Sequence, residues 1–335
     1  MSSMTSSTPR PRIALTLGDP SGIGPELAAK LVADPSNRAR ADILVLASGE
    51  ELDTAAAEAG VEILHAGTAG PDAVAAVGSS LSGAPVERGR VSVEGGRRAM
   101  TDLESALDMH ERGDVDAIVF TPLNKAALAM AGMAHEDELR WFAQRLGYRG
   151  TTSELNLVPG LTTSRVTSHI PVSEVASCIS AHRVAEAARL LNTVVLAQGV
   201  ERPRLAVCAL NPHAGEGGKF GREEIDHIAP AVALLQSEGV DAQGPFPCDT
   251  LFIRAREGEF DGVVTMYHDQ GQIAMKLMGF DQGVTVQGGL PVPIATPAHG
   301  TAYGIVGKGV ASTGPTQRAF DVALELAERE LARPS

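Results

Sequence analysis

The sequence has little of several residue types that define whole classes of protein. Its 335 residues include three cysteines and one tryptophan, and aromatic residues make up 4%. Cys178, Cys208 and Cys248 are odd in number and lack the spacing of a metal-binding motif. This pattern indicates reduced thiols in a cytosolic protein and not a disulfide framework. We assign no chemistry to them.

Long apolar runs and basic clusters are also missing. No stretch approaches the roughly 20 apolar residues of a membrane span, and residues 1–11 lack the apolar core of a signal peptide. With a net charge of −13 and no cluster of Lys and Arg, the chain lacks the basic face that nucleic-acid phosphates require. These absences predict a cytoplasmic protein with a disordered lead over residues 1–11, without nucleic-acid or membrane partners.

The remaining composition, 44% apolar and 21% charged, is that of a globular protein large enough for two lobes. Strands are predicted at 13–17, 42–47, 115–122, 153–158, 165–168, 204–210, 263–266, 284–287 and 292–296, of which 115–122 and 263–266 are of the buried type. Helices are predicted at 49–59, 94–112, 136–147, 181–198, 223–238 and 317–333, with a connection near 60–90. This alternation predicts an α/β fold with a wound sheet.

One stretch, DGVVTMYHDQGQIAMK at 261–276, combines an apolar strand with a polar corner and a helix. His268 is expected at the carboxyl end of that strand, where open α/β sheets bind ligands. Lys276 follows about two helical turns later and is near enough to serve the same site.

His169 and His213 also follow predicted strands. Three neutral imidazoles at three strand ends predict a divalent-metal site with open positions for a substrate. The long sequence intervals between them are not those of a compact metal motif. The alternative, histidines hydrogen-bonded beside loops, therefore stays open.

A glycine-rich turn at 18–26 lies between a strand and a helix. It matches neither the Walker loop nor the dinucleotide fingerprint, so it is either a tight turn that needs its glycines or a loop that presents Asp19 to a substrate. Lys125 follows another predicted strand and either lines the same cleft or begins the next helix as a solvated lysine.

Five segments together resemble the 4-hydroxythreonine-4-phosphate dehydrogenase family of pyridoxal phosphate biosynthesis. They are LGDPSGIGPE at 17–26, NPHAGEGG at 211–218, GPFPCDTLF at 244–252, MYHDQG at 266–271 with Lys276, and HGTA at 299–302. The resemblance implies the isocitrate/isopropylmalate-dehydrogenase-like fold, with two α/β lobes about a cleft. It places 12–135 and 300–335 in the first lobe and 136–299 in the second, which would carry the metal and the dimer interface.

The resemblance also implies roles for individual residues. His169, His213 and His268 would bind one divalent metal (Zn, Mg, Mn or Co), with one of them supplied across a homodimer. The family's substrate lysine falls on Lys276, which would bind substrate or assist proton transfer. From the chemistry of the reaction, we expect Asp249 to orient a ligand or the metal-bound alcohol. His299, Gly300, Thr301 and Ala302 would hold the adenosine end of NAD or NADP.

Departures from the family pattern fall where substrate is held. A Gly-His-Thr-Glu motif is replaced by 137–140, although His135 lies nearby. A substrate-binding Asn becomes Thr285, an Arg becomes Ile294, and an acidic residue of the nucleotide loop becomes Gly304. Arg140 is expected to recruit a different anionic group, or else to be a solvated helix residue.

The predicted activity is NAD(P)-dependent oxidation of a secondary alcohol in a small anionic hydroxy acid, followed by decarboxylation of the β-keto acid. The substrate is 4-phosphohydroxy-L-threonine or a 4-phosphorylated sugar acid such as threonate or erythronate. Alternatives are a non-phosphorylated hydroxy acid, an aromatic cis-dihydrodiol carboxylate, or a sugar-acid-binding protein without redox turnover. The departures favour a substrate other than 4-phosphohydroxy-L-threonine.

Overall fold

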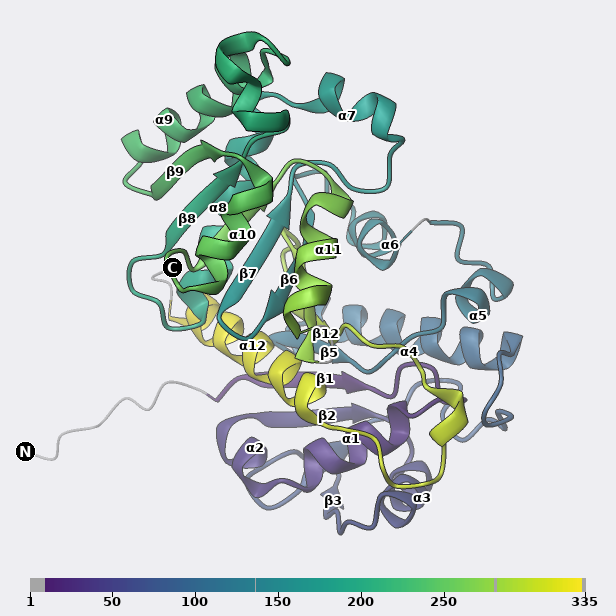
Figure 1. The fold of residues 1–335 in the computed structure, drawn as a ribbon. Coiled ribbons are helices and arrows are strands. Elements are labelled where there is room, and N and C mark those ends of the chain that lie inside the picture. The colour runs from purple at the N-terminus through teal and green to yellow at the C-terminus, as the bar shows by residue number, and fades with distance from the viewer. Residues whose placement is uncertain (1–9, 136, 280–281, 333–335) are drawn as a thin grey trace, which may run out of the picture. The chain divides into compact units, whose positions relative to one another are not determined.

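The computed structural model describes residues 10–135, 137–279 and 282–332 (Figure 1). The chain divides into unit 1, Met1–Ala134 with Val292–Ser335, and unit 2, His135–Pro291. This division differs from the expected boundary after residue 299, because the strand Ile294–Pro297 pairs with a strand of unit 1. The expected disordered lead lies, as far as residue 9, outside the described residues.

Unit 1 is built on parallel strands in the order β3-β4-β2-β1-β5-β12. They are β1 (Arg12–Thr16), β2 (Asp42–Leu46), β3 (His65–Ala66), β4 (Val74–Ala76), β5 (Ala117–Phe120) and β12 (Ile294–Pro297). The order changes direction between β1 and β5. The carboxyl ends of these two strands therefore border the crevice in which α/β sheets bind ligands.

Helices cover both faces of this sheet. They are α1 (Gly24–Ala33), α2 (Pro35–Arg40), α3 (Gly49–Ala59), α4 (Val93–Glu111), α5 (Lys125–Met130) and α12 (Gly314–Leu331). Helix α1 packs against α3 and α12 on one face, and α4 packs against α5 on the other (Figure 1). Helix α3 begins with a capping box between Ser48 and Glu51, which satisfies two otherwise unpaired backbone N–H groups.

Unit 2 has a mixed sheet in the order β11-β6-β7-β10-β8-β9. Its strands are β6 (Ser153–Val158), β7 (Leu161–Arg165), β8 (Arg204–Cys208), β9 (Asp241–Phe246), β10 (Gly262–Thr265) and β11 (Val284–Gly288). Strands β11, β6 and β7 pair antiparallel, whereas β7, β10, β8 and β9 pair parallel. The parallel part brings the carboxyl ends of β7, β10 and β8 side by side.

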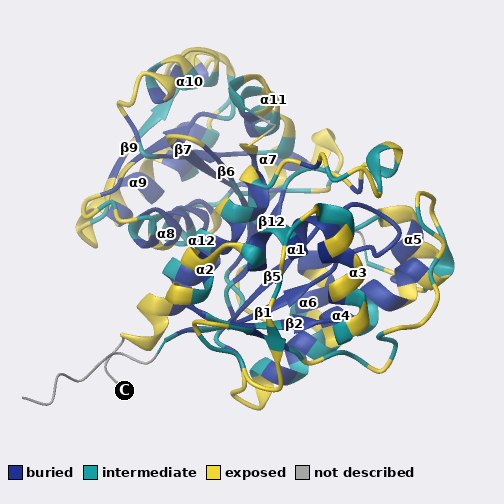
Figure 2. Cartoon of the chain, turned by 90° about the horizontal axis from the view of Figure 1, so that it is seen from below, coloured by how far each residue is buried: buried dark blue, intermediate teal, exposed yellow. Residues whose placement is uncertain are grey.

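The main helices of unit 2 are α6 (Glu138–Arg145), α7 (Val172–Cys178), α8 (Ala181–Ala197), α9 (Ala229–Ser237), α10 (Cys248–Arg256) and α11 (His268–Gly279). In Figure 1, α10 and α11 lie in front of the strands, and α8 runs behind them. Helix α8 packs on β7 and β10, and α11 packs on β6 and β7. Figure 2 shows most strands of both units in the buried colour and the outward faces of many helices as exposed.

Three predicted elements differ from the structure. The predicted strand at 165–168 is wrong, because the turn at Gly160 (φ 80°) lets the strand begin at Leu161 and end at Arg165. The predicted connection near 60–90 contains the short strands β3 and β4. The predicted helix at 223–238 begins as a π-helical turn, Glu224–Ile228, before α9.

The central strands β1, β5 and β10 are mostly apolar and buried. Ile13, Leu15 and Val263 are among the core residues with no exposed surface, as expected for parallel strands that helices cover on both faces. Among the described residues, no helix is both long enough and apolar enough to cross a membrane.

Candidate active site

The three predicted metal ligands all lie beyond the carboxyl ends of neighbouring strands in unit 2. His169 follows β7, His268 is the first residue of α11 after β10, and His213 follows β8. Strand β10 pairs with both β7 and β8. The local context predicted for the three histidines is therefore present.

His169 and His268 form a close pair. Their ring centroids are 5.6 Å apart, and two imidazoles on one tetrahedral zinc, with Zn–N bonds of about 2 Å, would have centroids roughly 5 Å apart. Each Nδ1 already has a carboxylate partner, Asp137 Oδ2 at 3.0 Å for His169 and Asp269 Oδ1 at 2.7 Å for His268. A carboxylate that holds one ring nitrogen leaves the other to bind a metal.

His213 lies apart from this pair in an exposed loop, Pro212–Gly218. Its ring contacts Phe220 at a centroid distance of 6.4 Å. His213, Ala214 and Glu216 have positive φ angles of 52°, 52° and 43°, a conformation that costs non-glycine residues of order 1 kcal/mol each. Within the described part of this single chain, no group of three His, Cys, Asp or Glu side chains could hold a metal.

The sequence did not assign a role to Asp137, although its side chain binds both the start of α6 and His169. Its Oδ1 accepts a hydrogen bond from the backbone N–H of Arg140 (2.8 Å) and caps α6, while its Oδ2 binds His169. The side chain is 4% exposed. The sequence could have indicated Asp137 as the N-cap of α6, because aspartate is favoured there. It could not have indicated that the same side chain lies next to His169.

We expect Asp137→Asn to lower metal affinity by about 10- to 100-fold, the usual effect of losing the carboxylate behind a ligand histidine. Asparagine caps helices as well as aspartate does, so the unfolding free energy should change little. Titration of the purified variant with Zn²⁺ and a urea unfolding curve would measure the two effects. Unchanged metal affinity would contradict the proposed role of His169.

The other predicted residues of unit 2 occupy different elements. Asp249 lies exposed in the first turn of α10, and Lys276 lies exposed on α11. Thr285 is half-buried on β11, and its Oγ1 donates a hydrogen bond to Asn156 Oδ1 at 3.4 Å. Arg140 is exposed in the first turn of α6 and lines a cavity next to His169.

In unit 1, Asp19 lies at the carboxyl end of β1 and is 1% exposed. Its Oδ2 accepts a hydrogen bond from Tyr303 Oη at 2.5 Å, and its Oδ1 accepts one from the backbone N–H of Ser21 at 2.9 Å. Burial and this carboxylate raise the pKa of the Tyr303 phenol. Asp19 thus holds the segment that follows Ala302, a contact that the sequence did not reveal.

The predicted nucleotide segment packs directly on the glycine-rich turn. Thr301 is buried, and its carbonyl accepts a hydrogen bond from Ile23 N–H at 3.0 Å. A Cβ on Gly22 would lie 2.8 Å from Thr301 Cβ. Ala302 has a φ of 44°, and His299 Nε2 is a buried atom without a hydrogen-bond partner among the described residues.

Two glycines of the glycine-rich turn, Gly18 and Gly24, lie where a side chain would not fit. A Cβ on Gly18, which has a φ of 60°, would lie 2.3 Å from Thr121 O, and a Cβ on Gly24 would lie 2.0 Å from Leu17 O. The tight-turn interpretation is thus correct for these glycines. Lys125 is exposed and is the first residue of α5, which begins four residues after Thr121.

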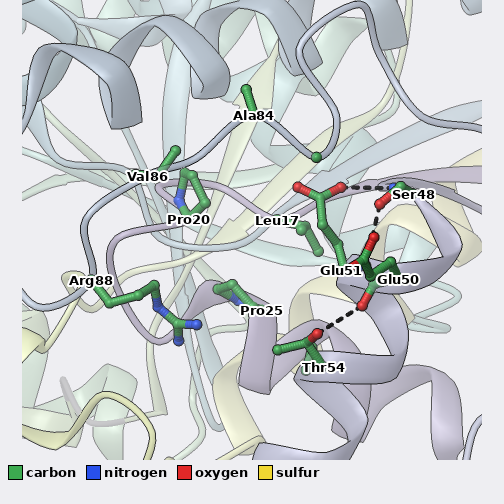
Figure 3. A pocket seen from close by; sticks show the side chains of 12 residues that line it. Leu17, Pro20, Pro25, Ser48, Glu50, Glu51, Thr54, Ala84, Val86 and Arg88 are labelled. Carbon is green, nitrogen blue, oxygen red and sulfur yellow. Dashed lines mark hydrogen bonds between the residues drawn. The ribbon is translucent and has the colours of Figure 1, made fainter.

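A cavity of about 290 Å³ lies beside the same turn, between the start of α3 and the segment 83–88. Figure 3 shows Glu51 and Ser48 joined by their two hydrogen bonds on one side, with Val86 and Arg88 on the other. Arg88 also pairs with Glu58 at 3.0 Å. The predicted site residues, all of them described, do not line this cavity.

Comparison with known proteins places the chain in a family. The family model described as "Pyridoxal phosphate biosynthetic protein PdxA" matches residues 38–323. The chain belongs to the PdxA family. A Pseudomonas aeruginosa protein named "Putative 4-hydroxythreonine-4-phosphate dehydrogenase 2" is 49% identical over 326 residues, which cover 94% of this chain and 97% of that protein.

Two further proteins are similar to this chain, one in sequence and one in structure. A Bradyrhizobium diazoefficiens protein named "Putative D-threonate 4-phosphate dehydrogenase" is 37% identical, with 94% of this chain and 96% of that protein covered. The crystal structure of a 4-hydroxythreonine-4-phosphate dehydrogenase from Burkholderia phymatum has a TM-score of 0.78 and 36% identity, and covers 95% of this chain and 98% of that one. The predicted α/β fold class is confirmed.

One departure of this chain from the family pattern has a clear place in the structure. Ile294, which stands where the resemblance places an arginine, has no exposed surface and is the first residue of β12. An isoleucine offers no hydrogen-bond donor or charge to a substrate from its side chain. Any arginine that binds substrate in this protein must therefore come from elsewhere in the chain.

Proposed function

We propose that the protein is a metal-dependent, NAD(P)-linked dehydrogenase that oxidises the secondary alcohol of a 4-phosphorylated hydroxy acid. Decarboxylation of the resulting β-keto acid would complete the reaction. The observation that carries the proposal is the pair His169 and His268, each anchored by a carboxylate, at adjacent strand ends. Homology to proteins named for 4-phosphorylated substrates supports it.

His169 and His268 would hold the metal together with His213 of the partner subunit in a homodimer. The exposed loop around His213, strained at three non-glycine residues, supports a contribution to a second chain. When bound, the metal acts as a Lewis acid on substrate oxygens and the nicotinamide accepts hydride. Imidazole ligands suit Zn best, whereas Mg and Mn prefer oxygen ligands such as water or the substrate's own oxygens. Zn, Mg, Mn and Co all remain candidates, and either NAD or NADP suits the proposal.

The chain's own residues have distinct tasks in this scheme. Asp137 and Asp269 fix the two imidazoles, and Asp249 orients substrate or a ligand. Lys276 binds an anionic group or moves a proton at the reacting carbon. In unit 1, the segment 299–302 would hold the adenosine end of the nucleotide. A hydrogen bond to the nucleotide would satisfy the Nε2 atom of His299, which has no partner among the described residues. Lys125 would line the substrate side. Three free thiols suit a cytoplasmic location.

A panel of hydroxy acids tests the proposal. NADH and NADPH formation would be measured with Mg²⁺, Mn²⁺, Co²⁺ or Zn²⁺. We expect threonate or erythronate 4-phosphate to give the highest kcat/KM, and 4-phosphohydroxy-L-threonine to be roughly tenfold or more poorer, because the segment 137–140, Thr285 and Ile294 all differ where the family resemblance places contacts to that substrate. The highest kcat/KM for a non-phosphorylated acid or a dihydrodiol carboxylate would contradict it, as would binding without turnover.

A further inference from the structure

A cavity in unit 2 is lined by three arginines. It measures about 380 Å³, within the range of small-ligand sites, about 300–1,000 Å³. It lies between the starts of β6 and α8, the end of β7 and the first turn of α6. Its charged lining residues are Arg140, Arg165, Arg183, Asp137 and Glu154.

Arg165 is the buried member of this set, with a side chain that is 4% exposed. Its Nη2 pairs with Glu154, and its Nε donates a hydrogen bond to Ser168 Oγ at 3.0 Å. Its Nη1 is buried and has no hydrogen-bond partner among the described residues. A buried cationic donor without a partner is costly, so this guanidinium has unused capacity for an anionic acceptor.

Arg183 approaches the cavity from the first turn of α8. It is exposed, and its Nη1 donates a hydrogen bond to Cys178 O at 3.2 Å. Helix α8 has 17 residues and is capped by Ser180, so the positive end of its dipole is also on this side. Arg140 adds a third guanidinium from α6.

The charges around the cavity favour an anion. Three arginines face two carboxylates, and both carboxylates are already engaged, Asp137 with His169 and Glu154 with Arg165. The lining thus carries a formal net charge of +1, in a protein whose overall charge is −13. Guanidinium groups pair readily with the oxygens of a phosphate, and these three come from three different elements, β7, α6 and α8.

The cavity adjoins the candidate metal site. Ser168 and Ile170, the neighbours of His169, line it, and Asp137 borders the cavity while binding His169. We propose that this cavity binds the phosphate of the substrate, with Arg165 and Arg183 as its specificity-determining residues. The inference rests on the proposed function only for the identity of the molecule that carries the phosphate. The arginines of this cavity supply the guanidinium groups that Ile294 cannot.

Inorganic phosphate binding to the full-length protein tests the inference without turnover. We expect Arg183→Gln to weaken phosphate binding, measured by calorimetry, roughly tenfold or more. The matched control is Arg189→Gln on the same helix, where Arg189 pairs with Glu238 at 2.6 Å away from the cavity lining. This control should bind phosphate as the wild type does.

The kinetic arm compares a phosphorylated hydroxy acid with its non-phosphorylated counterpart. Arg183→Gln should lower kcat/KM for the phosphorylated acid by a similar factor and leave that for the counterpart unchanged. Equal phosphate affinity in wild type and Arg183→Gln would overturn the inference, as would succinate binding as tightly as phosphate. If no hydroxy acid is oxidised, the proposed function fails, and the phosphate measurement still decides this site.

Discussion

Replacing His268 by alanine is expected to abolish stoichiometric metal binding and to lower turnover by roughly a thousandfold or more. The reason is that a metal acting as a Lewis acid supplies several kcal/mol of transition-state stabilisation, and His268 is one of only two predicted ligands that approach each other in this chain. Its side chain is 37% exposed, so the fold should survive the change. Metal content by mass spectrometry and NAD(P)H formation measure the two effects.

The matched control is His182→Ala, because His182 is an exposed histidine in α8 that follows no strand end. This variant should keep metal and activity. If His268→Ala retained wild-type turnover after chelation and dialysis, the histidine would be a hydrogen-bonded loop residue, which is the alternative that the sequence left open. His169→Ala should behave as His268→Ala does, since the two rings form one pair.

Arg98→Ala is expected to destabilise the protein by about 3–5 kcal/mol, the usual cost of removing one partner from a buried ion pair. Arg98 is 1% exposed and Asp102 is fully buried, with Nε and Oδ2 at 2.9 Å. Arg98 also binds Glu51 at 2.5 Å and the Leu46 carbonyl at 3.1 Å. It therefore connects α4, α3 and the end of β2. Urea unfolding at a fixed protein concentration measures the loss.

An exposed pair with the same sequence spacing gives the control. Arg222 and Asp226 are also four residues apart, with Nη2 and Oδ1 at 2.8 Å, but their side chains are 63% and 44% exposed. Exposed pairs of this kind contribute about 0.3–0.5 kcal/mol. A loss for Arg98→Ala as small as that for Arg222→Ala would show that the buried network does not stabilise unit 1.

The effect of Arg98→Ala should also depend on pH. Burial raises the pKa of Asp102 to about 6, although Arg98 opposes this shift. Without Arg98 the folded-state pKa would rise further above its unfolded value, so the native state would bind more protons and lose stability as pH increases through that interval. The difference between wild type and variant should therefore be larger at pH 8 than at pH 5.

Much of the fold could be predicted from local patterns. Helix α3 was predicted with its observed ends, because Ser48 and Glu51 cap its start and Gly60, with a φ of 67°, ends it. Buried strands such as β10 and β5 are continuous apolar runs that periodicity detects. Strand β7 was displaced because its sequence, LTTSR, is polar although every residue is buried.

The candidate site was only partly predictable. Strand ends located His169, His213 and His268, since the carboxyl ends of parallel strands share one edge of a sheet. Contacts between distant segments left no local signal. The bonds from Asp137 to His169 and from Tyr303 to Asp19 span 32 and 284 residues, and the arginine-lined cavity assembles β7, α6 and α8. Such contacts depend on packing, which sequence periodicity does not describe.

The most direct measurement is subunit complementation between His213→Ala and His268→Ala. In a dimer with shared sites, a mixed pair contains one intact site, built from His169 and His268 of one chain and His213 of the other. Random exchange should make roughly half the dimers mixed and restore about a quarter of wild-type NAD(P)H formation. Absence of any recovery, after mass spectrometry has confirmed mixed dimers, would contradict a metal site shared between subunits.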